Sequence, residues 1–444
     1  MKRAVFCLLF LSAFLRFHIL SACAQERDTV SRNVLPNGLV TLFREEKSRG
    51  IVAVDVFIKV GLEQEDDPHA GITNLIQSLL IKGTRELSGE TMQSRLETSG
   101  TFIESRAEPD YALISVMTSR SNFRRTLGLL SDLLREPLFD QKELEKDRQR
   151  LIDELDSQKG GYKDLYEIFL QSFYRYHPYR LPRWGYSSSV KQLNRESLLA
   201  FYRNFYVSNR MVVSIVGDLE KSEALDAVSD SFKNFKPGAG RPLEITWEPP
   251  KEEQTLSFSV MSNLSMIMVG YPAPDVRSPD YPAMKILHTV LGSGLGSRLW
   301  LELREKRGLS YDLGSFFPAL EGPSHFVTYV VSDPQNAWEC RRRILREIKN
   351  IKTSGITADE LKNAKEQLAG QYLLDREICK DQAFAIGEAE ILNQSYRFDI
   401  NFPVKIEAVT LDDVRRVAQT YLVNPLILET SPMDMGPQMR IRGY

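Results

Sequence analysis

The sequence repeats one pattern of elements in its two halves, and this repeat is what most limits the fold. Every second residue from 52 to 60 is valine or isoleucine, and this period of two predicts a strand. We expect residues 256–269, rich in valine, methionine and serine, to form the corresponding strand in the second half. A repeat of about half the chain is far longer than a solenoid repeat, so it indicates duplication of a whole domain.

Each predicted strand precedes a predicted amphipathic helix. In both halves apolar residues recur at relative positions 0, 3, 4, 7 and 8, which places them on one face of a helix. Each helix is therefore expected to bury one apolar stripe. The first stripe is Ile72, Leu75, Ile76, Leu79 and Leu80, and the second is Ala283, Ile286, Leu287, Val290 and Leu291.

Two matched helix starts set the offset between the halves. Residues 140–143 (Asp-Gln-Lys-Glu) and 357–360 (Thr-Ala-Asp-Glu) both have the spacing of a capping box. In a capping box the first side chain accepts from free helix amides and the glutamate reaches back. Leu151 and Leu368 follow the two boxes at the same distance, so the offset is 217 residues at both positions.

A segment rich in proline, glycine and charge separates the halves, as linkers often do. On either side of it, predicted strands are interleaved with long predicted helices, which favours two α+β domains. We place the first domain at residues 29–235, the linker at 236–250 and the second domain at 251–444.

Residues 1–24 have the three-part pattern of a secretory signal peptide. Two basic residues precede an apolar run at residues 4–15, which is too short to span a bilayer comfortably. Two interpretations of cleavage remain open. Residues 22–24 (Ala-Cys-Ala) fit an ordinary cleavage site, whereas residues 20–23 (Leu-Ser-Ala-Cys) resemble a lipobox that would leave Cys23 lipidated. We expect an exported protein, in the bacterial periplasm or anchored to a membrane and facing it.

Removal of the signal peptide would change the net charge from −2 to −5, because this segment holds three basic and no acidic residues. A mildly acidic chain lacks the basic patch that nucleic-acid binding requires. Beyond Cys23 only Cys340 and Cys379 remain, so the protein is not built on disulfides. We expect both cysteines to be unpaired small side chains in a core.

Six stretches in the two halves together carry a family resemblance: residues 35–39, 71–84, 177–179, 209–217, 291–299 and 303–311. Through them the mature chain resembles the pitrilysin and mitochondrial processing peptidase family of inverted zincins. The resemblance implies two homologous domains, each a mainly antiparallel sheet packed with helices. It also implies that the chain forms half of a clamshell chamber.

The zinc motif of that family is degenerate in this chain. The family carries His-x-x-Glu-His on its first helix, where two imidazoles bind zinc and the glutamate activates water. Alignment on residues 82–84 places Asn74, Gln77 and Ser78 at these three positions, and Glu154 at the third ligand. Neither an amide nor a hydroxyl replaces an imidazole ligand, and Gln77 has no basic carboxylate.

No other metal or nucleophile site emerges from the sequence. Asp147 lies two helical turns before Glu154 on one predicted face, but a carboxylate pair is more often a solvated helix face than a metal site. No Gly-x-Ser-x-Gly elbow or Cys/His pair indicates a nucleophile. The histidines of the mature chain show no ligand-like spacing, so we expect no zinc in this chain; they are His69, His177, His288 and His325.

By contrast, Arg304 and Tyr311 match an arginine and a tyrosine that in the family reach the substrate bound at the zinc. A guanidinium and a phenol are donors that can stabilise a developing oxyanion. Without the resemblance, they would be an exposed helix charge and a strand residue of the core. The resemblance also places a glycine-rich loop near the substrate, and this loop lacks the lysine of a P-loop. The loop contains Gly292, Ser293, Gly294, Gly296 and Ser297.

These features imply a non-catalytic, substrate-binding subunit of an exported heteromeric zinc metalloprotease. A homologous partner with His-x-x-Glu-His would hold the zinc, and this chain would add Arg304 and Tyr311 for hydrolysis of a peptide or unfolded protein. We expect this chain to bind no cofactor and to have no peptidase activity alone. Contact with a membrane would require a lipid on Cys23. The alternative is a non-enzymatic scaffold or peptide-binding subunit of a cell-envelope complex.

Overall fold

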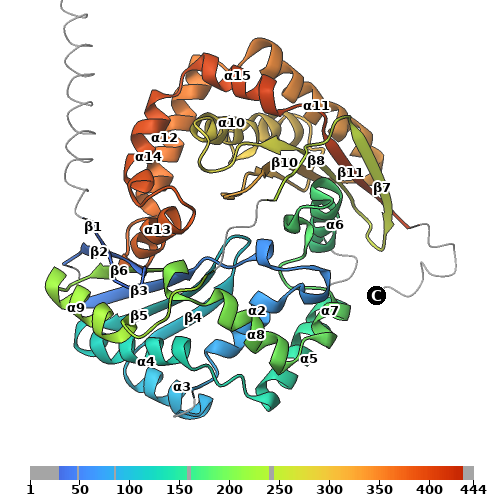
Figure 1. The fold of residues 1–444 in the computed structure, drawn as a ribbon. Helices are drawn as coiled ribbons and strands as arrows, with labels where there is room; N and C mark the ends of the chain where they lie inside the picture. The colour runs from blue at the N-terminus through green and yellow to red at the C-terminus, as the bar shows by residue number, and fades with distance from the viewer. Residues whose placement is uncertain (1–29, 48–49, 85–86, 158–161, 240–244, 434–444) are drawn as a thin grey trace, which may run out of the picture.

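Two β-sheets, one in each half of the chain, organise the computed structural model (Figure 1). The structure describes residues 30–433 except for 48–49, 85–86, 158–161 and 240–244. The first sheet contains β1 (Ser31–Val34), β2 (Val40–Glu45), β3 (Ile51–Ile58), β4 (Phe102–Ala107), β5 (Ala112–Ser119) and β6 (Met211–Gly217). The second contains β7 (Gln254–Val260), β8 (Ser265–Ala273), β9 (Asp312–Phe316), β10 (Ser324–Ser332) and β11 (Leu426–Pro432).

The order of the strands confirms the duplication. The first sheet has the order β1-β2-β6-β3-β5-β4, and the second has the order β7-β11-β8-β10-β9. Once β1 is set aside, the two orders correspond strand by strand. Each sheet also has one parallel pair, β2 with β6 and β7 with β11, while the other pairs are antiparallel. The prediction of an α+β fold with mainly antiparallel sheets is confirmed.

The prediction of one strand over residues 256–269 is wrong. Residues 256–260 end β7, residues 265–269 begin β8, and a turn lies between them. In this turn the Ser262 amide donates to the Val260 carbonyl at 2.9 Å, and the Leu264 amide donates to the Ser262 hydroxyl at 3.1 Å. Serine side chains favour such local bonds over a strand ladder. The strand that corresponds to β3 is therefore β8 alone.

The helices repeat with the offset that the sequence predicts. Helices α5 (Gln141–Ser157) and α12 (Ala358–Leu374) begin and end 217 residues apart, and so do α6 (Tyr162–Tyr174) and α13 (Cys379–Ile391). The other helices of the first half are α2 (Ile72–Leu80), α3 (Gly89–Thr98), α4 (Phe123–Arg135), α7 (Ser187–Gln192), α8 (Arg195–Phe205) and α9 (Lys221–Phe232). Those of the second are α10 (Tyr281–Gly292), the π-helix Trp300–Glu305, α11 (Ala337–Ser354), α14 (Arg397–Ala408) and α15 (Leu411–Tyr421).

Local signals place several helices correctly. All five residues of each predicted stripe on α2 and α10 are buried. Thr357 and Glu360 form both bonds of the capping box, at 3.2 and 2.7 Å. At the other predicted box, Asp140 accepts from the Glu143 amide at 3.1 Å, but the Glu143 carboxylate pairs with Lys146 at 2.8 Å. Only half of that box therefore forms.

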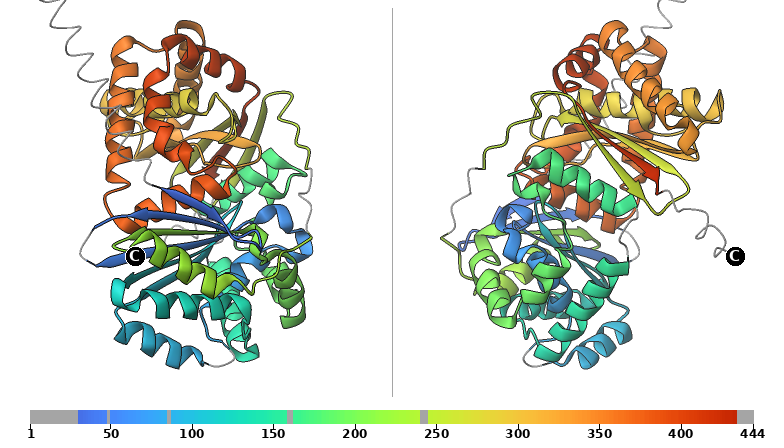
Figure 2. Two further views of the ribbon diagram at one scale, coloured as in Figure 1. Left: turned by 60° about the vertical axis from the view of Figure 1, so that its left-hand side comes forward. Right: turned by 90° about the vertical axis from the view of Figure 1, so that its right-hand side faces the viewer.

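Each half covers the sheet of the other half with one helix. Helix α13, from the second half, packs on β3 and β6 of the first sheet, and α6, from the first half, packs against the second sheet (Figures 1 and 2). Two glycines permit these close contacts. A Cβ atom on Gly387 of α13 would lie 2.2 Å from the Phe57 ring, and one on Gly270 of β8 would lie 2.2 Å from the Phe169 ring of α6. Each half therefore needs a helix of the other half to cover one face of its sheet.

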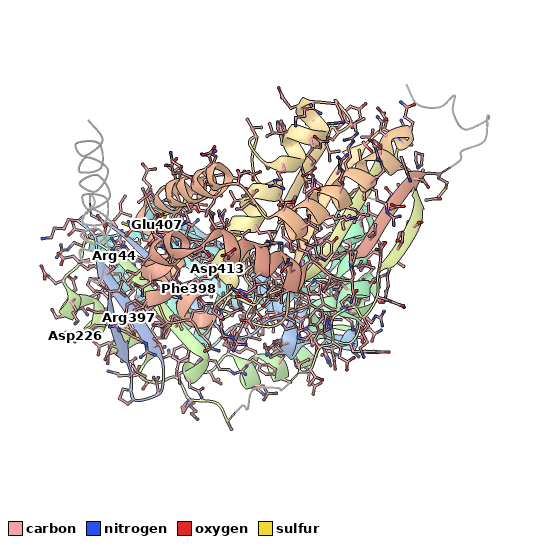
Figure 3. The ribbon with its side chains drawn as sticks, turned by 90° about the horizontal axis from the view of Figure 1, so that it is seen from above. Arg44, Asp226, Arg397, Phe398, Glu407 and Asp413 are labelled. Atoms are coloured by element: carbon pink, nitrogen blue, oxygen red, sulfur yellow. The ribbon has the colours of Figure 1, made fainter. Side chains whose placement is uncertain are left out.

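The remaining helices of the second half lie on the outer side of the second sheet. Helices α14 and α15 both pack on α10. The view from above marks α14 by Arg397, Phe398 and Glu407, and α15 by Asp413 (Figure 3). Within the described residues, Cys340 and Cys379 are both buried and form no disulfide, as expected of small side chains in a core. No helix in the described part of the chain is long and apolar enough to cross a membrane.

A buried carboxyl group lies under α13. Asp55 of β3 is inaccessible to solvent and shares the sheet face of Ala53 and Phe57, which belong to the core formed with α13. Burial raises the pKa of Asp55 to about 7, although the nearby Ser115 side chain and the charges of Arg106 and Lys380 oppose the shift and the charge of Glu104 adds to it. The folded protein therefore holds a proton that the unfolded chain releases near the ordinary carboxyl pKa.

Asp55 is expected to destabilise the folded protein as the pH rises from about 4 to above 7, because in that range the folded state still binds a proton at this carboxyl group that the unfolded chain has released. Burial also raises the pKa of Glu65 to about 7 and that of Asp110 to about 6, so these two carboxyl groups act on stability in the same direction as Asp55. Relative to the wild type, the melting temperature of Asp55→Asn should increase as the pH rises, and it should be the higher of the two at about pH 8. Thermal unfolding followed by circular dichroism checks this. Identical pH profiles for the two proteins would contradict it.

Candidate functional site

The first predicted site lies on α2, whose start is fixed by a buried carboxylate. Glu65 Oε2 accepts from the Gly71 amide at 2.8 Å, and its Oε1 accepts from the Thr73 amide at 3.0 Å. These bonds satisfy two of the free amides at the helix N-terminus. Two of the three zinc-motif positions that follow, Asn74 and Ser78, are half-buried, and Gln77 is buried.

The Gln77 side chain is fully engaged within the first domain. Its Nε2 donates to the Tyr206 hydroxyl at 2.8 Å, and its Oε1 accepts from the Ser105 hydroxyl at 2.6 Å. The Ser78 hydroxyl donates to the Leu75 carbonyl, one turn earlier, at 2.9 Å. The position of the family's base is thus a neutral amide in a closed hydrogen-bond network. Such an amide neither binds Zn²⁺ well nor takes a proton from water.

Asp147 and Glu154 of α5 are both paired with cations of the chain itself. Asp147 is buried, with Lys82 Nζ at 3.7 Å and Arg150 Nε at 3.8 Å. Glu154 has a side chain that is 48% exposed and pairs with Arg150 at 3.2 Å. The expectation of a solvated helix face is therefore confirmed for Glu154 and wrong for Asp147, because Lys82 from the end of α2 packs over Asp147. In the described residues, no group of three or more His, Cys, Asp or Glu side chains is arranged to hold a metal ion.

Each of the four histidines makes contacts of its own. His69 Nδ1 lies 2.6 Å from Asp66, and His177 Nδ1 accepts from the Tyr179 amide at 3.2 Å. Burial lowers the pKa of His177 to about 4 and the pKa values of His288 and His325 to about 3, so these imidazoles are neutral. His325 lies between two tyrosine hydroxyls, those of Tyr166 and Tyr174. These contacts fit structural roles for the histidines.

The structure brings Arg304 and Tyr311 together in the second half. Arg304 lies on the π-helix and Tyr311 directly precedes β9. Arg304 Nη1 donates to the Ser310 carbonyl and, at 3.2 Å, to the Tyr311 carbonyl. The Tyr311 side chain is 57% exposed, so it is not the core residue that a strand position alone would suggest. Its hydroxyl donates to Asp333 Oδ2 at 3.1 Å, a contact that the sequence does not predict.

The glycine-rich loop leads from α10 into the helix that carries Arg304. Ser293 accepts at its carbonyl from Gln367 Nε2 at 3.4 Å, and Gly294 has a φ of +85°, which favours glycine. The buried Ser297 donates from its hydroxyl to the Gly294 carbonyl at 2.8 Å and closes the loop. Between them Leu295 is 70% exposed. The loop presents an apolar side chain to solvent and contains no phosphate-binding lysine.

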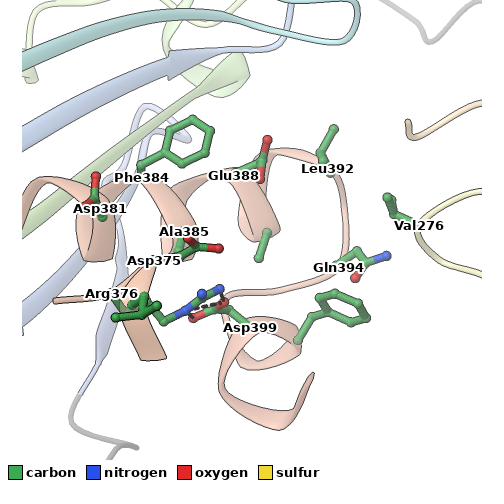
Figure 4. A pocket seen from close by; sticks show the side chains of 13 residues that line it. Val276, Asp375, Arg376, Asp381, Phe384, Ala385, Glu388, Leu392, Gln394 and Asp399 are labelled. Carbon is green, nitrogen blue, oxygen red and sulfur yellow. Dashed lines mark hydrogen bonds and ion pairs between the residues drawn. The ribbon is translucent and has the colours of Figure 1, made fainter. Parts of the chain in front are cut away.

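Two cavities beside α13 are not predicted by the sequence. One of about 450 Å³ lies beside α13 and α14, where Arg376 pairs with Asp399 (Figure 4). The other, of about 520 Å³, is lined by α13, α6 and the β4–β5 turn. Phe384 and Glu388 line both cavities, and none of the sequence-predicted site residues lines either. The only signal in the sequence is the presence of two glutamates, Glu388 and Glu390, in the largely apolar stretch 383–391.

Comparison with known proteins gives matches along most of the chain. Residues 40–184 match the family described as insulinase (peptidase family M16), and residues 192–368 match the peptidase M16 inactive domain. An uncharacterised zinc protease of Bacillus subtilis is 22% identical, over 88% of this chain and 95% of the relative. Zinc protease PqqE of Helicobacter pylori is 23% identical, over 87% of this chain and 89% of the relative.

Solved structures match the fold of both halves. A protease from Helicobacter pylori superposes with a TM-score of 0.85 at 21% identity, over 91% of this chain and 99% of the other. A peptidase M16 inactive domain from Pseudomonas fluorescens gives a TM-score of 0.84 at 21% identity, over 91% and 98% of the two chains. The family resemblance that the sequence motifs indicate is confirmed. Since family models cover most of both halves and the fold agrees throughout, the chain belongs to peptidase family M16.

Proposed function

We propose that this chain is the non-catalytic, substrate-contacting subunit of an exported two-chain zinc protease. The observation that carries the proposal is a contrast within one chain. Gln77 occupies the position of the base as a buried amide with both ends bonded, whereas Arg304 and Tyr311 are paired and solvent-accessible. A partner with His-x-x-Glu-His would supply zinc and water activation. This chain would supply donors to the substrate and part of the chamber wall.

The hydrogen bonds of Arg304 and Tyr311 favour a second candidate function. Both groups already donate within the chain, to backbone carbonyls and to Asp333. A pair used only in this way would be structural, and the chain would then be a scaffold or peptide-binding subunit of a cell-envelope complex. Activity measurements on the assembled protein separate the two functions, because only the first makes turnover depend on this pair.

We expect the purified chain to hold no stoichiometric zinc and to hydrolyse no peptide, because Asn74, Gln77 and Ser78 replace the two imidazoles and the base. Mixed with a homologous chain that carries His-x-x-Glu-His, it should form a stable complex with zinc-dependent activity. Metal analysis, size-exclusion chromatography and peptide hydrolysis provide the measurements. One tightly held zinc per chain that is lost in Glu154→Gln would contradict the proposal, and so would a chain that stays monomeric beside its homologue.

A further inference from the structure

The Tyr311 hydroxyl is held at one end of the β9–β10 ladder. The Tyr311 amide donates to the Val331 carbonyl at 2.9 Å, which places the residue opposite the end of β10. Asp333 follows β10 directly, and its carbonyl accepts from the Asn336 amide at 2.9 Å in the turn before α11. Backbone bonds thus fix both residues, and their side chains meet at 3.1 Å. The tyrosine ring is more than half exposed, so this contact is the main constraint on its hydroxyl.

Arg304 and Asp333 constrain different parts of Tyr311. Arg304 binds the carbonyls of Ser310 and Tyr311 and therefore fixes the backbone. Asp333 accepts the phenolic proton and therefore fixes the hydroxyl. A phenol has a single O–H, so a proton given to a carboxylate is not available to a substrate oxygen. In this conformation Tyr311 offers a substrate only acceptor lone pairs.

We propose that Asp333 is a positioning residue that holds the Tyr311 hydroxyl in a resting orientation, from which it must be released before it donates to a substrate. This inference rests on the proposed function. The electrostatics agree with it, since the hydrogen bond and negative charge of Asp333 raise the pKa of Tyr311 while Arg304 acts in the opposite direction. The negative charge of Asp333 would also repel the negative charge that develops on the substrate oxygen. Release lets the Tyr311 hydroxyl donate to that oxygen at a greater distance from the Asp333 carboxylate.

Asp333→Asn should ease the release, because a neutral acceptor binds a phenol less strongly than a carboxylate does. In the assembled protease we expect kcat/KM to rise by roughly 3- to 10-fold, the scale of one net hydrogen bond. The rise must vanish when Tyr311→Phe is also present, because the phenylalanine has no hydroxyl to release. Asp312→Asn is the matched control: it removes a carboxylate one residue from Tyr311 that interacts with Tyr329 instead.

The contact can be tested in this chain without a partner. Carbon-13 NMR of ring-labelled tyrosine follows the titration of each phenol, and Tyr311→Phe identifies the Tyr311 signal. Asp333→Asn should lower the pKa of Tyr311 toward that of a free tyrosine, and Asp312→Asn should leave it near the wild-type value. The melting temperatures should stay close to that of the wild type. An unchanged pKa of Tyr311 in Asp333→Asn would overturn the inference.

Different results overturn the proposed function and the role of Asp333. Normal turnover of the complex with Tyr311→Phe would overturn the proposed function, whatever the NMR result. The resting role of Asp333 would be overturned with it. A complex impaired by Tyr311→Phe but indifferent to Asp333→Asn overturns the role of Asp333 alone. A lower pKa of Tyr311 together with a Tyr311-dependent rise in kcat/KM supports both.

Discussion

Replacing Tyr311 with phenylalanine is expected to lower kcat of the assembled protease by roughly 100-fold, the scale on which one oxyanion donor acts. The substitution removes a hydroxyl and keeps a ring that is already mostly exposed, so folding and assembly should not change. The donor works chiefly in the transition state, and therefore kcat and kcat/KM should fall together while KM stays nearly constant. Steady-state hydrolysis of a peptide by the reconstituted complex gives these constants.

Arg304→Lys tests the support of the same donor. Lysine keeps the charge but lacks the planar guanidinium whose Nη1 donates to the carbonyls of both Ser310 and Tyr311, so turnover should fall here too. Matched controls are Tyr176→Phe, at a tyrosine that is 94% exposed in the first half, and Arg307→Lys, three residues after Arg304. Full activity in both Tyr311→Phe and Arg304→Lys would make the pair structural and would favour the scaffold function.

Gly387→Val is expected to destabilise the whole chain by about 3 kcal/mol or more, because overpacking a closed core forces side chains and backbone to shift. A Cβ atom at Gly387 would lie 2.2 Å from Phe57, which is fully buried in the middle of the first sheet. Gly270→Val should act in the same way from the other side, since its Cβ atom would lie 2.2 Å from the buried ring of Phe169. Chemical denaturation followed by tryptophan fluorescence measures the free energy of unfolding.

The control for this prediction lies one helix earlier. Gly370 of α12 is exposed, and a Cβ atom there would have no heavy atom within 4 Å, so Gly370→Val should change stability by less than about 0.5 kcal/mol. Both halves should unfold in one transition in every variant, because each sheet is covered by a helix of the other half. Two separate transitions, or a Gly387→Val protein as stable as Gly370→Val, would show that the exchanged helices do not couple the halves.

Much of the candidate site could be predicted because it depends on residue identity. The loss of the zinc ligands needs only the side chains at positions 74, 77 and 78, and the Arg304 and Tyr311 pair needs only their spacing. The environment of these residues could not be predicted in the same way. The partners of Gln77 come from Ser105 and Tyr206, which are 28 and 129 residues away. No residue close to α2 in the sequence indicates that both ends of the Gln77 side-chain amide are already hydrogen-bonded.

The sequence by itself determined the duplication, the offset of 217 residues and the starts of the capped helices, because periodicity and capping act within a few residues. It failed at residues 261–264, where serine and asparagine interrupt an apolar pattern with a turn. Only the tertiary structure decided that α6 and α13 exchange places and that Asp333 holds Tyr311. Sheet faces and helix stripes are apolar in both halves, so hydrophobic burial alone does not specify which helix covers which sheet. Close-fitting pairs such as Gly387 with Phe57 determine which helix covers which sheet, and these pairs form only when segments distant in the sequence meet.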